Sequence, residues 1–155
     1  MELTYQALNG NKEVAGSINN LKIFTRLAKL LKRNSSRLQE AYRLCDSITT
    51  QLDTHGILYP NIYAEMGDIL VKMGNYPLAK SAIDTALQQD PKSVVAVTAL
   101  ARLEAQQGNV TTAEAVLRTA LERIGRQLPL VLEMASHLLH HHHNNTQRMK
   151  EAKQL

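Results

Sequence analysis

Histidines near the carboxyl end are the residues of this chain whose type and spacing are best suited to chemistry. His140–His143 are four consecutive histidines, and His137 lies one helical turn before them. In a helix, His137 would share a face with His140 or His141, a spacing at which imidazoles bind Zn²⁺, Ni²⁺ or Cu²⁺. A zinc site normally has a third or fourth protein ligand, and no His-Glu-x-x-His arrangement supplies one. Three interpretations stay open: a polar helix end, weak metal binding, and a functional metal site. We favour the first and predict no cofactor.

Sequence signatures of catalysis are otherwise missing. The chain has no phosphate-binding glycine loop, no Gly-x-Ser-x-Gly nucleophile elbow and no Cys-x-x-Cys pair. The single cysteine, Cys45, follows a helical pattern with Leu44 and Ile48, which predicts a small core residue rather than a nucleophile. We therefore expect a protein that is not an enzyme.

The composition indicates which fold, which class of partner and which cellular compartment to expect. A hydrophobic content of 44%, with 4% aromatic residues and no Trp, is typical of a helical stack built on small residues. The net charge of +4 is too small an excess to predict nucleic-acid binding. One cysteine permits no intramolecular disulfide. The chain shows no signal segment and no apolar run of about 18 residues, so we expect a cytoplasmic protein without a transmembrane segment.

The middle of the chain contains nearly the same sequence twice. Two identical stretches recur at a spacing of 34 residues: Gly74-Asn75 as Gly108-Asn109, and Thr85-Ala86-Leu87 as Thr119-Ala120-Leu121. Ala79 and Ala86 are seven residues apart, as are their counterparts Ala113 and Ala120, so each pair shares one helix face that a neighbouring helix can approach closely. The glycines predict left-handed helix ends. A fixed period of this length predicts stacked repeats.

The elements that position these residues are helices. Apolar periodicity predicts them over residues 18–33, 36–53, 60–73, 76–89, 93–107, 110–124 and 129–141. Ser93 predicts a helix N-cap, and Thr111 with Glu114 predicts a capping box. Thr54-His55-Gly56 and Tyr59-Pro60 predict a loop between the second and third helices. We divide the chain into a leader of residues 1–16, flexible or a short helix, a repeat domain of residues 17–143 and a polar tail of residues 144–155.

The 34-residue unit resembles the tetratricopeptide repeat, a helix–turn–helix unit of that period. In the first copy the resemblance rests on Tyr63, Met66-Gly67, Gly74, Tyr76, Ala79, Ile83, Ala86 and Pro91. In the second it rests on Val97, Leu100-Ala101, Gly108, Val110, Ala113, Leu117 and Ala120. The second copy departs from the pattern at Glu104 and at Gly125, which replaces the closing proline. The resemblance implies an all-α, right-handed α-solenoid of antiparallel helix pairs. It would have about three pairs (18–53, which is degenerate, 60–91 and 94–125) plus a C-terminal capping helix at 129–141.

In this family the first helices of successive repeats line a concave groove that holds an extended peptide or a partner helix. Mapped by the 34-residue register, the groove residues would be Asn61, Ala64, Asp68 and Lys72 in the first copy, Thr98, Arg102, Ala105 and Gln106 in the second, and Ser136 and His140 in the terminal helix. Lys72 and Arg102 would meet acidic side chains of the partner. Ala64, Asp68, Thr98 and Arg102 depart from the clamp with which some members bind a C-terminal carboxylate.

The helix over residues 18–33 admits two interpretations. Its expected apolar stripe is Ile18, Leu21, Phe24 with Ile23, Leu27, Leu30 and Leu31, and its remaining face carries Lys22, Arg26, Lys29, Lys32 and Arg33. A basic amphipathic helix can lie on an anionic membrane or bind a partner. The alternative, which we favour, is the first helix of the solenoid, with the stripe inward and the charges in water.

The leading hypothesis is a non-catalytic scaffold that binds a peptide or helix of a partner protein. The resemblance also allows an accessory or chaperone-like protein of a secretion or pilus assembly system. The histidines allow a metal-binding protein that uses His137, His140 and His141. Stacking of exposed terminal helices would give a homodimer.

Overall fold

The computed structural model describes residues 18–141, 150–151 and 153–155, and every element in this part of the chain is helical. A 3₁₀ turn, η1 (Ser35–Arg37), joins α2 (Ile18–Lys32) to α3 (Leu38–His55). The next elements are α4 (Pro60–Met73), α5 (Tyr76–Gln89), α6 (Val94–Gln106), α7 (Val110–Arg123) and α8 (Leu128–His141). The prediction of an all-α fold is confirmed.

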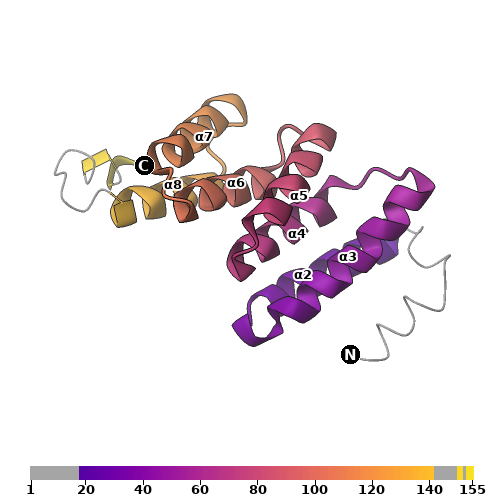
Figure 1. Cartoon of the computed structure of the whole chain (residues 1–155). Coiled ribbons are helices and arrows are strands. Elements are labelled where there is room, and N and C mark those ends of the chain that lie inside the picture. Colours follow the sequence, from indigo (N-terminus) through magenta and orange to yellow (C-terminus); the bar gives the residue numbers. More distant parts are fainter. Residues whose placement is uncertain (1–17, 142–149, 152) are drawn as a thin grey trace.

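Consecutive helices form pairs that stack along one direction (Figure 1). The pairs are α2 with α3, α4 with α5, and α6 with α7. The first helices of the pairs, together with α8, also touch one another in chain order. Each helix thus packs against its partner in the pair, and each pair packs against the next one in the stack, which is the arrangement of a helical repeat solenoid. The expected solenoid is confirmed.

Small residues allow the helices to approach closely. Ala79, Ala86, Ala113 and Ala120 are all at most 5% exposed. Gly67 in α4 has still less room, because a Cβ added there would lie 2.5 Å from Cγ1 of Ile83 in α5. Close packing of this kind leaves no space for even one additional methyl group without a shift of a neighbour.

The turns follow the local rules that the sequence predicts. Gly74 and Gly108 have φ values of 78° and 85°, which are left-handed conformations that glycine adopts without a Cβ penalty. After α4, the N–H groups of Gly74 and Asn75 donate to the carbonyls of Val71 and Leu70. Ser93 caps α6, since its Oγ accepts a 3.3 Å hydrogen bond from the N–H of Ala96. The predicted N-cap is therefore confirmed.

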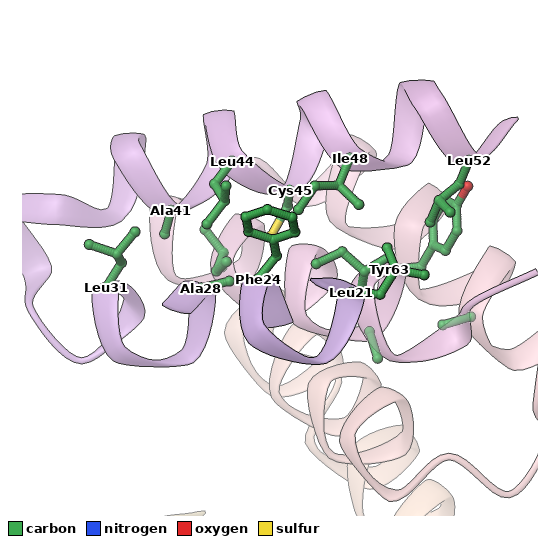
Figure 2. Packing of buried hydrophobic residues seen from close by; sticks show 14 of the residues in the cluster. Leu21, Phe24, Ala28, Leu31, Ala41, Leu44, Cys45, Ile48, Leu52 and Tyr63 are labelled. Atoms are coloured by element: carbon green, nitrogen blue, oxygen red, sulfur yellow. The ribbon is translucent and has the colours of Figure 1, made fainter. Parts of the chain in front are cut away.

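The first pair has its own core, shown in Figure 2. Leu21, Phe24 and Leu31 of α2 pack with Leu44 and Cys45 of α3 in one buried cluster. Burial raises the pKa of the Cys45 thiol to about 12. The thiol is therefore protonated at neutral pH and serves as a core side chain, as predicted.

The connection between α3 and α4 differs from the expected loop. α3 continues through Thr54 and His55 and ends at Gly56, which has a φ of 64°. Thr54 Oγ1 donates to the carbonyl of Thr50, and His55 Nδ1 lies 2.8 Å from the carbonyl oxygen of Gln51. Because these side chains bond to carbonyls of their own helix, they extend α3 instead of ending it. Part of the segment that the sequence assigns to the loop therefore lies in α3, which has 18 residues, whereas α5 has 14.

The expected capping box at the start of α7 is wrong. The helix begins at Val110, one residue before Thr111, and Asn109 occupies the N-cap position without a side-chain cap. Glu114 instead accepts a 3.0 Å hydrogen bond from Nε of Arg118, one turn along the same helix.

The expected burial pattern of α2 needs two corrections. Ile23 and Leu30 are each 59% exposed, because the buried face runs through Leu21, Phe24, Ala28 and Leu31. Lys32, expected in water, is instead largely buried against α4, where it forms ion pairs.

Some expectations fall outside the described residues, namely the leader of residues 1–16 and the histidines at positions 142 and 143. In the described part of the expected polar tail, residues 150, 151, 153 and 154 are helical, and Glu151 pairs with Arg118 at 2.9 Å. Among the helices of the described ranges, none has the length and apolar character needed to cross a membrane.

Replacement of Gly67 by Ala tests the close contact between α4 and α5. Helix propensity alone would favour Ala by about 1 kcal/mol. The added methyl group would overlap Ile83, and overpacking of a core costs about 1–3 kcal/mol. We expect Gly67→Ala to lower the free energy of unfolding in urea by about 1 kcal/mol. The reverse change at the matching position, Ala101→Gly, should also destabilise, through lost propensity. A Gly67→Ala variant as stable as the wild type would contradict the contact.

Candidate functional site

A cleft lies where the end of α4 and the turn into α5 meet α6. Its volume is about 490 Å³, and its walls are Val71, Lys72, Met73, Gly74, Tyr76, Arg102 and Gln106. Three residues that the sequence assigns to a groove, Lys72, Arg102 and Gln106, therefore come together at one surface. They meet because α4 and α6, whose residues correspond at the 34-residue spacing, pack side by side.

Local structure at the end of α4 shapes this cleft. The left-handed Gly74 ends the helix and turns the chain, so that Tyr76 begins α5 beside the last turn of α4. Pro77 occupies the first turn of α5, where its missing N–H leaves no hydrogen bond unmade. These rigid turns hold Met73 and Tyr76 as an apolar wall next to the polar side chains of Lys72 and Gln106.

Beside the cleft, five charged residues form a network that we call the ion-pair ladder: Lys32, Glu65, Asp68, Arg102 and Glu133. Lys32 Nζ of α2 donates to Glu65 at 2.8 Å and to Asp68 at 2.6 Å, both in α4. Arg102 of α6 donates from Nη1 to Asp68 at 2.9 Å and from Nη2 to Glu133 of α8 at 2.7 Å. The ladder thus joins the first helices of the stack by charge-assisted hydrogen bonds.

The ladder shifts the pKa values of Asp68 and Lys32 in opposite directions. Burial alone would raise the pKa of Asp68, but the charges and hydrogen bonds of Lys32 and Arg102 hold it below its ordinary value. Burial alone would lower the pKa of Lys32, but Asp68 and Glu65 raise it above the ordinary value. Asp68 and Lys32 are therefore both charged at neutral pH.

Asp68 does not have the environment that the sequence analysis expects of a groove residue. Its two carboxylate oxygens are occupied by Lys32 and Arg102, and the side chain is buried. Ala64 is fully buried, and Thr98 is buried with its hydroxyl donating to the carbonyl of Val95. Ala64 and Asp68 are thus parts of the packing between helices, because α2 and α6 cover that face of α4. The Thr98 hydroxyl is bonded within its own helix, α6.

The remaining groove candidates lie away from the cleft walls. Asn61 is exposed in the first turn of α4, and Ala105 is half-buried in α6. Ser136 and His140 are exposed on α8, where His140 Nδ1 lies 2.8 Å from the carbonyl oxygen of Ser136.

The three histidine candidates for a metal site, His137, His140 and His141, all lie on α8. His137 is buried, and its Nε2 lies 3.2 Å from the carbonyl oxygen of Val110. The rings of His137 and His141 are 4.9 Å apart. Within the described ranges no group of three or more His, Cys, Asp or Glu side chains could hold a metal ion.

Sequence reasoning missed Lys32, Glu65 and Glu133 as members of the ladder. A signal was present in part, because Asp68 and Arg102 are opposite charges at matching positions of adjacent repeats. Glu65 and Glu133 are also in register, since they are 68 residues apart, which is two periods. Lys32 is not, because it lies 36 residues before Asp68 and outside the two clear copies.

A second cleft, of about 620 Å³, lies between α5, α6 and α7. Its walls include Leu87, Val97 and Val116, with Lys92 and Arg123 among the lining side chains. Although it is the larger, no predicted groove residue lines it. Polar groups of α4 and α6 converge instead at the cleft of Lys72, Arg102 and Gln106.

Replacement of Asp68 by Asn tests the ladder through its pH dependence. A carboxylate whose folded-state pKa is depressed contributes stability that is complete above its ordinary pKa of 3.8 and is lost as the pH falls through the folded-state value. Near neutral pH we expect Asp68→Asn to lower the free energy of unfolding by about 3 kcal/mol, since Lys32 and Arg102 lose a buried partner. The difference from wild type should shrink below about pH 4.

Urea unfolding across a pH series measures both effects. Asp84→Asn is the matched control, since Asp84 pairs with Lys80 at the surface and its loss should cost at most about 0.5 kcal/mol. Wild-type and Asp68→Asn curves that run parallel at all pH values would rule out the proposed role of the carboxylate.

Comparison with known proteins agrees with the geometry. The family model of the tetratricopeptide repeat matches residues 65–129. The match extends from α4 through α5, α6 and α7 to the start of α8. A search of curated proteins finds no match to the chain. The matched segment contains the first 34-residue copy from Glu65 onwards and the whole of the second, with their turn glycines and buried small residues, so this part of the chain consists of tetratricopeptide repeats.

Proposed function

We propose that this protein is a non-catalytic scaffold that binds a segment of a partner protein in the cleft of Lys72, Arg102 and Gln106. Tetratricopeptide repeats generally mediate interactions between proteins, which supports the class of function. The observation that carries the proposal is the convergence of three polar side chains from two repeats with the apolar side chains of Val71, Met73 and Tyr76 around one concave surface.

The charges around the cleft favour an acidic residue in the partner. Lys29, Lys32 and Arg102 are balanced by Glu65, Asp68 and Glu133, so the ladder with Lys29 is neutral. Lys72 is exposed and forms no ion pair with any residue that the structure describes. The positive charge available to a ligand therefore comes from Lys72.

Arg102 contributes to the site in a different way. Its side chain is 39% exposed, and its Nε, Nη1 and Nη2 groups already donate to Glu133 and Asp68. A guanidinium has five N–H donors, so donors remain for a carbonyl or carboxylate oxygen of the partner. The Gln106 amide can donate and accept beside it, as the backbone of an extended peptide requires.

The apolar wall gives the second half of the recognition. Met73 and Tyr76 are half-buried and can contact one apolar side chain of the partner. We therefore infer a preference for an acidic residue next to an apolar one. Ordering of an extended segment costs conformational entropy, so affinity should be modest.

We also infer the domain organisation. The α2–α3 pair packs on α4 as α4 packs on α6, which supports a divergent third repeat at residues 18–55. Leu130, Met134 and Leu138 of α8 are buried in one cluster with Val97 and Leu117, which supports α8 as the capping helix.

Charge reversal at Lys72 tests the proposed cleft. Random peptides displayed on phage are first selected on the wild-type protein, and the enriched sequences are synthesised for isothermal titration. We expect these sequences to combine Asp or Glu with an apolar residue, and Lys72→Glu to weaken their binding about tenfold, a loss of about 1.4 kcal/mol.

The matched control is Lys92→Glu, which makes the same charge change at an exposed position of the turn between α5 and α6. It should leave the affinity unchanged, and circular dichroism should show the same helix content for both variants. Equal affinities of the wild type and Lys72→Glu would exclude the cleft as the binding site.

A further inference from the structure

The outer face of α2 is strongly basic. Its sequence contains no acidic residue. Lys22, Arg26 and Arg33 are exposed and form no ion pair within the described ranges, while Lys29 is half-exposed and pairs only with Glu65, at 3.4 Å. With 3.6 residues per turn, Lys22, Arg26 and Lys29 lie within an arc of about 60° and form one row along α2, and Arg33 follows in the turn after the helix.

A second row on the same helix is apolar and exposed. Ile23 and Leu30 are seven residues apart, so they share a face, and each is 59% exposed. Leu27 lies at the edge of this row and is half-buried. The row is distinct from the inward face of Leu21 and Phe24, which packs against α3 (Figure 2). Large aliphatic side chains thus lie exposed next to a row of cations.

We propose that this outer face of α2 docks on an anionic lipid surface. The inward stripe and the docking face are separate, so α2 can be the first described helix of the solenoid and a membrane-binding element as well. Cations would meet the lipid phosphates, and their aliphatic stems would lie along the acyl boundary. Ile23 and Leu30 would enter that boundary, as the apolar side chains of interfacial helices do.

The shape of the face favours a lipid surface over an acidic protein. Among the described elements, α2 contacts η1, α3 and α4, which cover its inward side. The exposed side is the convex surface of one helix at an end of the stack (Figure 1). A flat bilayer can contact such a surface along its whole length. The neighbouring α3, in contrast, exposes both signs of charge at Arg43, Asp46 and Asp53, so charges of one sign are concentrated on α2.

Vesicle co-sedimentation of the full chain tests the proposal. The probes are vesicles of phosphatidylcholine alone and of phosphatidylcholine mixed with phosphatidylglycerol. We expect binding to the anionic vesicles only, weakened by added salt. Lys22→Glu with Arg26→Glu should weaken it at least about tenfold, since each reversal replaces attraction by repulsion. Ile23→Ser with Leu30→Ser should also weaken it several-fold, because the apolar insertion is lost.

Two control variants distinguish an effect of this face from a general effect of net charge or of exposed apolar side chains. Lys72→Glu with Lys92→Glu makes the same charge change elsewhere, and Leu78→Ser with Leu128→Ser removes exposed leucines of α5 and α8. Both should bind vesicles more tightly than the corresponding α2 variant. All the substituted side chains are exposed, so thermal unfolding should be nearly unchanged.

Several results would overturn the proposal. They are equal binding to neutral and anionic vesicles, equal losses in the control and α2 variants, and full binding by Ile23→Ser with Leu30→Ser. Complete displacement from anionic vesicles by soluble poly-glutamate at a matched charge concentration would indicate an acidic protein as the partner instead. Lys72→Glu alone should not change vesicle binding, so the failure of this inference and that of the peptide cleft can be told apart.

Discussion

Close approach of helices at positions without large side chains is the constraint on which this structure depends. Gly67 leaves no room for a Cβ beside Ile83, and Ala79 and Ala86 are buried in the same helix pair. Short side chains bring the helix backbones together, and the larger residues around them, such as Ile69 and Leu103, then fill the remaining space. Because each pair packs on the next, this local geometry repeats along the stack and sets the relative positions of the surface residues.

The ion-pair ladder acts across that stack. Hydrophobic contacts between neighbouring helices are non-directional, whereas the bonds of Asp68 to Lys32 and Arg102 require one register of three helices. Buried ion pairs are weak evidence for net stability, since desolvation offsets much of the attraction. Their contribution here is better understood as a fixed alignment of α2, α4, α6 and α8. The same bonds make Asp68 a structural residue and leave Lys72 as the cation that a partner can reach.

The two proposed surfaces differ in shape and in chemistry. The cleft beside Lys72 is concave and combines hydrogen-bonding groups with a small apolar wall, which is suited to a short segment of chain. The outer side of α2 is convex, with cations in one row and Ile23 and Leu30 in another, which is suited to an extended surface. A scaffold with both would hold a partner protein near an anionic membrane. The ladder begins at Lys32 on α2 and reaches Arg102 at the cleft, so the helix of one surface is tied to the walls of the other.

The sequence by itself determined the helices, their turns and the period. Gly74, Gly108 and Ser93 act through hydrogen bonds within a few residues, and the alanines recur on one face at helical spacing, so neighbouring residues suffice to predict them. The prediction from neighbouring residues was wrong at Thr54 and His55. Side chains of this kind favour turns, but here they bond to carbonyls of α3 and continue the helix instead of ending it. Only the tertiary structure decided which side chains reach the surface. It buried Asp68 and Lys32 against each other across 36 residues and left Leu30 exposed, because burial depends on which faces of distant helices meet, and no pattern within one helix contains that information.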